Sequence, residues 1–273
     1  MKRLLVFLVL MLSVSLAFGS YITFSVTLSS DSISGDSGKV NIRLDQRGDE
    51  PAYEIVVFPL ASDHFSYDGR IYSDKLNPGE SLEGSFTVFF KKNLTAGAYP
   101  FITRSIYHDS NMHPFSVVSY HHVVYKEKFE PKISGSIEGI ELPENSMTDF
   151  MLKVRNLEND SKEVTLKLYL PEELRTEKET EEFSLGPGEE KHLIYRIESS
   201  GALVGSYYSV LASMEYENDY HYTSFTSGTV RIVERKSILG VPYEWVIVIL
   251  IALVVIFVIY QVWGVLVEKK KSE

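Results

Sequence analysis

The sequence predicts an all-β protein in which two tandem β-sandwiches are followed by one C-terminal transmembrane helix. Three observations carry this prediction. Short apolar segments with period-two alternation recur between turn residues from residue 20 to residue 234. A Pro-Gly-Glu corner occurs twice, first at Pro78 and again at Pro187. A continuous apolar segment lies close to the C-terminus.

The first predicted sandwich covers residues 20–128 and is expected to be of immunoglobulin type. Its alternating segments are rich in β-branched and aromatic residues, and no sustained 3.6-residue period interrupts them. About seven short strands in a unit of roughly 100 residues are typical of such a sandwich. The expected strands include residues 21–28, 39–44, 53–60, 85–90, 99–108 and 115–125.

The second predicted sandwich, residues 129–234, repeats the order of the first at a nearly constant offset along the chain. The strand expected at 150–156, for example, corresponds to the one at 40–46. A constant offset over many elements indicates a tandem duplication. The joint "KEKFEPK", residues 126–132, is short and contains one proline, so we expect the two sandwiches to form a semi-rigid rod.

The duplicated corners are predicted to be structural turns. In "NPGE" and "GPGE", proline presets φ at the second turn position, and glycine supplies the positive φ that a type II turn requires at the third. We therefore expect Pro78-Gly79 and Pro187-Gly188 to start the same strand in each unit.

A Gly-x-Tyr sequence follows each of these strands. Gly97-Ala98-Tyr99 and Gly205-Ser206-Tyr207 are predicted tyrosine corners, in which the Tyr hydroxyl donates a hydrogen bond to backbone a few residues upstream. Tyr99 and Tyr207 would thus close the connection between two strands of each sandwich.

The order of these features resembles that of bacterial and archaeal immunoglobulin-like modules. The residues that carry the resemblance are "RGDEPA" at 47–52, the Leu-x-Pro-Gly-Glu corners and the Gly-x-Tyr sequences. The modules include the alpha-galactosidase-associated domain and the cell-adhesion-related domain, and the resemblance covers residues 35–125 and 145–232. The second unit departs from the pattern, with "LENDSKE" in place of "RGDEPA". The resemblance implies tandem modules on a membrane-anchored surface protein, with adhesion, spacing or accessory roles.

The N-terminus predicts a secretory signal peptide over residues 1–19. Lys2 and Arg3 precede an apolar stretch, and small residues occupy the two positions that a signal peptidase recognises, with cleavage expected after Gly19. An uncleaved membrane anchor is the alternative, although the apolar stretch is short for a span.

The C-terminus predicts a single membrane span at residues 245–267, preceded by a stalk at 235–244. The span includes one strongly polar side chain, Gln261, and tryptophans lie near both ends. The lysine-rich tail, residues 268–273, is expected in the cytoplasm. Its lysines also fit a dilysine retrieval pattern.

Composition excludes several function classes. The chain has no cysteine, which rules out disulfides, thiolate metal sites and cysteine catalysis and favours a bacterial or archaeal source. Its formal net charge is −10, which argues against nucleic acid as a partner. "GDSG" at 35–38 has no histidine upstream and is predicted to be a turn rather than a serine-protease nucleophile. We expect no catalytic residues and no cofactor.

Histidines cluster in the hairpin expected over residues 99–125. His108 could face His121 or His122 across it, and His113 would lie at its tip. Imidazole groups with a neighbouring carboxylate can bind Zn²⁺ or Cu²⁺. His108, His113 and His121 are the predicted metal ligands, with exposed polar strand residues as the alternative interpretation.

Two further surface features stand out. Asn93 and Asn159 each begin an N-glycosylation sequon within a predicted loop. Residues 172–182, "EELRTEKETEE", alternate acidic and basic side chains and are predicted to form a solvated loop or edge segment rather than a catalytic carboxylate pair.

We therefore expect a non-enzymatic, single-pass type I membrane protein whose immunoglobulin-like domains lie outside the cell and bind or space a partner. The expected partners are the membrane, through the single span, and a protein or glycan on the extracellular side. Two alternatives remain: an accessory subunit of a membrane complex that docks through its transmembrane helix, and a metal-binding ectodomain.

Overall fold

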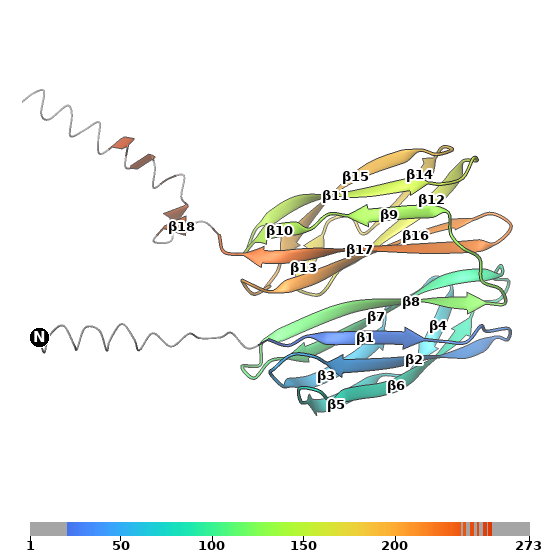
Figure 1. The fold of residues 1–273 in the computed structure, drawn as a ribbon, viewed down its shortest axis with the longest axis horizontal. Helices are drawn as coiled ribbons and strands as arrows, with labels where there is room; N and C mark the ends of the chain where they lie inside the picture. The colour runs from blue at the N-terminus through green and yellow to red at the C-terminus, as the bar shows by residue number, and fades with distance from the viewer. Residues whose placement is uncertain are drawn as a thin grey trace, which may run out of the picture.

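The structure is a computed structural model, and it describes a β-rich body and a few residues beyond it. The described residues are 21–235, 237–238, 241–242, 245, 248–249 and 251–252. Named elements in this part of the chain are all strands, which confirms the prediction of an all-β body (Figure 1).

The predicted membrane elements lie largely beyond the described residues. The signal peptide (1–19) and the tail (268–273) fall outside them altogether, as do parts of the stalk (235–244) and most of the span (245–267). In the portion that is described, no helix combines the length and apolar character needed to cross a bilayer.

The first half of the body, residues 21–125, has two layers of strands. One layer is a sheet of order β1-β2-β6-β4, and the other contains β5, β3, β7 and β8. The strands are β1 (Phe24–Ser29), β2 (Ser37–Gln46), β3 (Ala52–Pro59), β4 (Phe65–Asp68), β5 (Ile71–Leu76), β6 (Ser81–Phe90), β7 (Gly97–His108) and β8 (Pro114–Tyr125).

The second half, residues 133–233, is built in the same way. A sheet of order β13-β15-β11-β9 faces a layer that contains β14, β12, β16, β17 and β10. The strands are β9 (Ile133–Ile137), β10 (Ile140–Pro143), β11 (Met147–Asn156), β12 (Lys162–Tyr169), β13 (Leu174–Thr176), β14 (Thr180–Leu185), β15 (Glu190–Ser199), β16 (Tyr207–Glu217) and β17 (His221–Val233), followed by the short pair β18 (Ser237–Ile238) and β19 (Val241–Pro242).

Each half encloses its own hydrophobic core between its two layers. The alternation predicted for residues 39–44 holds, since Val40, Ile42 and Leu44 on β2 are all buried. Their counterparts on β11 are also buried: Phe150, Leu152 and Val154. The two cores draw on residues 33–123 and 133–232, but the exact domain boundaries remain a prediction.

The two Pro-Gly-Glu corners have nearly identical geometry. The Glu80 amide donates to the Asn77 carbonyl at 3.0 Å, with Gly79 at φ +83°. In the second half the Glu189 amide donates to the Gly186 carbonyl at 3.1 Å, and Gly188 has φ +65°. Glycine is needed at these positions because the left-handed conformation is strained for residues with a Cβ atom.

A residue with a buried amide side chain joins each corner to the neighbouring loop, since its backbone bonds to the corner and its side chain bonds to the loop. Gln46 and Asn156 are 1% and 0% exposed. Gln46 Nε2 donates to the Glu50 carbonyl at 2.7 Å, and Asn156 Nδ2 donates to the Asp160 carbonyl at the same distance. The repeat therefore extends from sequence to the hydrogen bonds of buried polar groups, which must be satisfied inside the fold.

The tyrosine corner differs between the halves. The Tyr99 hydroxyl donates to the Thr95 carbonyl at 2.6 Å, as expected. Tyr207, by contrast, is 65% exposed, and its neighbour Tyr208 packs into the second core. This corrects the prediction for Tyr207. Tyr208 follows Tyr99 at the same offset that separates the prolines of the two corners, and one more residue separates it from its glycine than separates Tyr99 from Gly97.

The two halves lie side by side and not end to end as a rod (Figure 1). β7 runs parallel to β17, and β17 is antiparallel to β16. β7 is therefore antiparallel to β16, its counterpart in the repeat. The duplicated units thus run in opposite directions, and the short joint at 126–132 reverses the chain between them.

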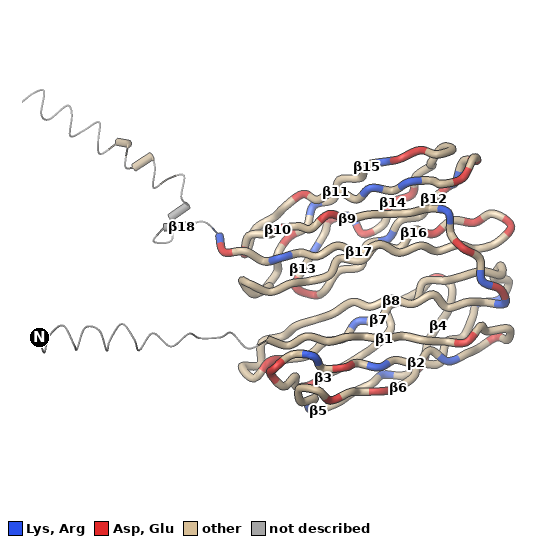
Figure 2. Tube along the Cα trace, viewed as in Figure 1, with Lys and Arg blue, Asp and Glu red and all other residues tan. Residues whose placement is uncertain are grey.

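The halves meet along β7, β8, β16 and β17, which we call the junction. Gly97 on β7 pairs with His221 on β17, so a single nine-stranded sheet passes through both halves within the described residues. Few charged side chains occur on these strands (Figure 2). An apolar cluster lies between the halves and consists of Ile102, Val118, Tyr169 and Leu211 with Leu60 and Phe225 packed against it.

Replacing Gly97 by Ala should weaken the junction. A Cβ atom at Gly97 would overlap the backbone carbonyl of His221, so β7 and β17 would have to separate. We expect a loss of about 1–3 kcal/mol in the free energy of unfolding, measured by denaturant titration. Gly35→Ala is the control, because open space surrounds that position. Equal stability of the two variants would contradict the described junction.

Replacing Tyr99 and Tyr207 by Phe tests which of the two predicted tyrosine corners is present. Tyr99→Phe removes a hydrogen bond to the Thr95 carbonyl and should cost about 0.5–1.5 kcal/mol of stability. Tyr207→Phe alters an exposed ring and should leave the unfolding midpoint unchanged. A larger loss of stability from Tyr207→Phe than from Tyr99→Phe would contradict the described positions of the two tyrosines.

Candidate functional site

The three predicted metal ligands do not come together. In the β7–β8 hairpin, His108 lies opposite Pro114, whereas His121 lies opposite Phe101. Seven residues of an extended strand separate these two positions, or about 23 Å. His113 lies near His108 at the hairpin tip, where its carbonyl accepts from the Asp109 amide.

His108 and His121 each contact another polar side chain instead. His108 Nδ1 lies 3.5 Å from a carboxylate oxygen of Glu54, and His121 Nε2 lies 2.9 Å from the Ser30 hydroxyl. Burial, with smaller contributions from His122 and Lys128, lowers the pKa of His121 to about 4.

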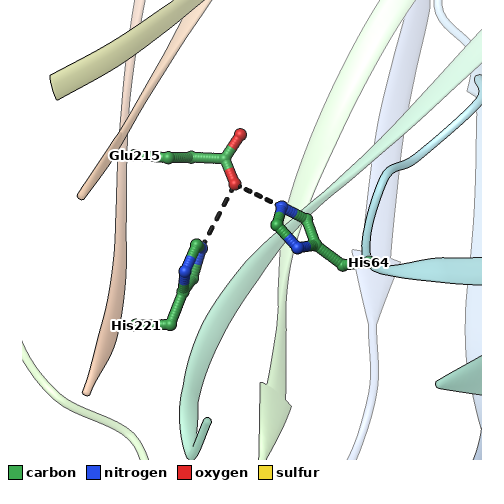
Figure 3. Close-up of side chains that lie close together, drawn as sticks. All are labelled: His64, Glu215 and His221. Carbon is green, nitrogen blue, oxygen red and sulfur yellow. Dashed lines mark hydrogen bonds and ion pairs between the residues drawn. The ribbon is translucent and has the colours of Figure 1, made fainter. Parts of the chain in front are cut away.

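A different cluster of possible metal ligands forms at the junction, from His64, Glu215 and His221 (Figure 3). His64 Nε2 lies 2.7 Å from Glu215 Oε2, and His221 Nε2 lies 3.2 Å from the same oxygen. The ligand atoms of the three side chains all lie within 4.8 Å of one another. We refer to these residues as the junction cluster.

The junction cluster combines both halves of the body. His64 belongs to the connection between β3 and β4 in the first half. Glu215 lies near the end of β16, and His221 is the first residue of β17, so the hairpin turn at 218–220 sets their spacing. The cluster exists only because the second half folds back beside the first.

Aromatic and acidic neighbours hold His221 in place. The Tyr99 ring stacks on the His221 ring, with centroids 4.1 Å apart and an interplanar angle of 8°. The other ring nitrogen of His221, Nδ1, lies 3.3 Å from Glu217 Oε1. The His64 ring packs against both Tyr99 and His221.

Glu215 is a buried carboxylate whose charge is stabilised by imidazoles. Its side chain is 14% exposed. Burial alone would raise the pKa of Glu215, but the hydrogen bonds with His221 and His64 outweigh it and bring the pKa to about 2. Glu215 is therefore ionised at neutral pH.

A small pocket of about 20 Å³ adjoins His64 and Glu215. Its lining includes Ser62, Asp63 and Lys167. A space of this size holds about one water molecule beside the junction cluster.

Further polar contacts join the halves along the junction. Near the junction cluster, the Thr223 hydroxyl donates to the Ala98 carbonyl at 2.8 Å, and His122 Nε2 lies 2.9 Å from the Thr223 carbonyl. On the opposite side of the junction, the Ser116 hydroxyl donates to Glu173 at 2.7 Å.

The acidic run at 172–182 forms an edge segment, one of the two forms predicted for it. It contributes the edge strand β13 and the start of the edge strand β14. Most of its side chains are exposed, but Glu173 is 5% exposed, and burial raises its pKa. The sequon residues Asn93 and Asn159 are exposed and lie in connections between strands.

Comparisons with known proteins do not assign a family. No family model and no curated protein matches the chain. Among solved structures, the chain is similar to alpha-2-macroglobulin from Escherichia coli (8% identity, TM-score 0.29) and to a mutant form from Salmonella (10% identity, TM-score 0.35). It is also similar to red sea bream transglutaminase (8% identity, TM-score 0.28).

These similarities cover 77–78% of this chain but only 16–31% of the other chains. At such low scores and identities they carry no functional information.

Sequence reasoning missed the junction cluster because its members are distant in sequence. His64 and Glu215 are 151 residues apart, and nothing in the strand pattern indicates that the halves fold against one another there. The available signal was the short Glu-x-Glu-x₃-His segment at 215–221, which places two carboxylates beside a histidine across a hairpin.

Replacing Glu215 by Gln should destabilise the body. His64 and His221 would lose a charged acceptor at a mostly buried position, with an expected loss of about 1–3 kcal/mol in the free energy of unfolding. Glu190→Gln is the matched control, because Glu190 pairs with His192 in solvent and its replacement should have no measurable effect. Equal effects of the two substitutions would contradict the described site.

His121 should make stability depend on pH. Its folded-state pKa of about 4 lies below the ordinary value near 6.5, so the unfolded chain binds the extra proton between these values. The contribution of neutral His121 to the free energy of unfolding is fully present above pH 6.5 and is lost as the pH falls toward 4. We expect His121→Gln to flatten the pH dependence of the unfolding free energy over this window. A profile identical to that of the parent protein would contradict this assignment.

Proposed function

We propose that this protein is a non-enzymatic, single-pass type I membrane protein whose two immunoglobulin-like sandwiches bind or space a partner outside the cell. The proposal combines the signal sequence, the apolar segment at 245–267 and the resemblance to bacterial and archaeal surface modules. Its strongest structural support is the position of the two ends of the body.

Both ends of the described body emerge on the same side (Figure 1). Tyr21 lines one cavity together with residues 203–208, and the Gly205 amide donates to the carbonyl of Ile232 near the end of β17. An anchor after residue 244 would therefore hold this end near the membrane. The opposite end, with the connections at 91–96, 126–132 and 218–220, would point away from it.

The junction cluster favours a non-catalytic role. General acid–base catalysis is most efficient when the pKa of the catalytic group lies near the working pH. The pKa of Glu215 is about 2, which is far below neutral pH.

The outer face of the sheet β13-β15-β11-β9 offers a contact surface for a partner protein. Ile194 on β15 is 74% exposed and lies directly opposite Met151 on β11, which is also exposed. This pair of adjacent exposed apolar side chains makes the face our candidate contact site.

Cysteine labelling tests the proposed topology, because the native chain has no cysteine. Asn159→Cys on the exposed loop of the second half and Ser272→Cys in the predicted tail provide one reporter each. We expect a membrane-impermeant maleimide to label Asn159→Cys on intact cells and Ser272→Cys only after lysis. Labelling of Ser272→Cys on intact cells, or protection of Asn159→Cys, would contradict the proposal.

Site-specific photocrosslinking tests the proposed contact face. A crosslinking side chain at Ile194 should capture a defined partner on the cell surface, and the same group at the exposed Lys39 of the first half should not. Equal capture at both positions, or none at Ile194, would remove this face from the proposal.

A further inference from the structure

The donor atoms of the junction cluster suit a transition-metal ion. Two imidazole nitrogens and one carboxylate oxygen are a ligand set that binds Zn²⁺, with metal–ligand distances of about 2.0–2.2 Å. Ligands in a tetrahedral arrangement at these distances lie roughly 3.3 Å apart. The His64–Glu215 and His221–Glu215 pairs are 2.7 and 3.2 Å apart, and all three ligand atoms lie within 4.8 Å of one another. A shift of about 1 Å or less by each side chain would therefore accommodate an ion.

The surroundings of His221 match those of a metal-binding histidine. Such residues generally donate their second ring N–H to a carboxylate or carbonyl, which fixes the tautomer and the ring orientation. Glu217 Oε1 lies 3.3 Å from His221 Nδ1, which leaves Nε2 facing Glu215 and His64. Stacking against Tyr99, whose hydroxyl is itself hydrogen-bonded, restricts rotation of the ring.

Space for a fourth ligand is present beside the cluster. The pocket of about 20 Å³ next to His64 and Glu215 has room for one water molecule. Three protein ligands and one water complete a tetrahedral zinc site. The positive charge of Lys167, which lines the same pocket, would repel a metal ion. Asp63 in the pocket lining and Glu217 beside His221 supply negative charge that offsets this repulsion.

The cluster occurs once in the duplicated body as the structure describes it. At the offset that relates Pro78 to Pro187, His64 corresponds to Glu173 and Glu215 corresponds to Ile106. The related position on the other side of the junction therefore lacks this ligand set, and the expected stoichiometry is one ion per chain.

We propose that His64, Glu215 and His221 bind one divalent transition-metal ion, with Zn²⁺ as the best match, and that this ion clamps the two halves of the body together. Because His64 comes from the first half and the other two ligands from the second, the ion would stabilise the side-by-side arrangement directly. Imidazole ligands select against Mg²⁺ and Ca²⁺, which prefer oxygen donors.

Calorimetric titration of the full-length chain with Zn²⁺ tests the proposal, in mild detergent and after removal of metals with EDTA. We expect one Zn²⁺ per chain, a higher thermal unfolding midpoint with Zn²⁺, and no response to Mg²⁺. His64→Ala should abolish both responses. Glu217→Gln should weaken Zn²⁺ binding about 10–100-fold, because it removes the group that orients His221.

His192→Ala is the matched control, since His192 is exposed, lies on β15 and also pairs with a glutamate. It should bind Zn²⁺ as the parent protein does. Co²⁺ provides a second readout: its visible absorption should indicate tetrahedral coordination in the parent and in His192→Ala, but not in a folded His64→Ala variant. Absence of Zn²⁺ and Co²⁺ binding by the parent, or binding that persists in His64→Ala, would overturn the proposal.

Discussion

The close approach of β7 and β17 is the constraint on which the rest of the structure depends. At Gly97 the backbones come so near that no side chain fits between them. This contact places Tyr99 against the His221 ring and brings Glu215 within reach of His64. The junction cluster, the polar contacts and the apolar contacts between the halves all follow from the same placement.

Sequence divergence between the two copies gives the duplicated chain a unique site. The antiparallel, side-by-side arrangement creates two related positions at the junction. Different residues occupy them: His64 meets Glu215, whereas Glu173, its counterpart in the repeat, meets Ser116. The antiparallel orientation also places both ends of the described body on one side (Figure 1).

Local features of the fold were predictable from sequence, and the junction was not. The period-two pattern identified the buried face of β2, and the Pro-Gly-Glu corners revealed the repeat. Both features could be recognised because each is encoded by residues that are close together in the sequence. The side-by-side arrangement depends instead on contacts between residues that are far apart in the chain. A trace of it in the sequence is the small hydroxyl side chains of Thr103, Ser105 and Ser213, which are fully buried on junction strands.

A double-mutant cycle between His64 and Glu215 tests the central claim that the two halves are joined at the junction. The free energy of unfolding would be measured in EDTA for the parent, for His64→Ala, for Glu215→Ala and for the double variant. Direct contact across the junction predicts a coupling energy of about 0.5–3 kcal/mol. If the two substitutions are additive, with coupling below about 0.3 kcal/mol, His64 and Glu215 do not interact and the described junction is contradicted.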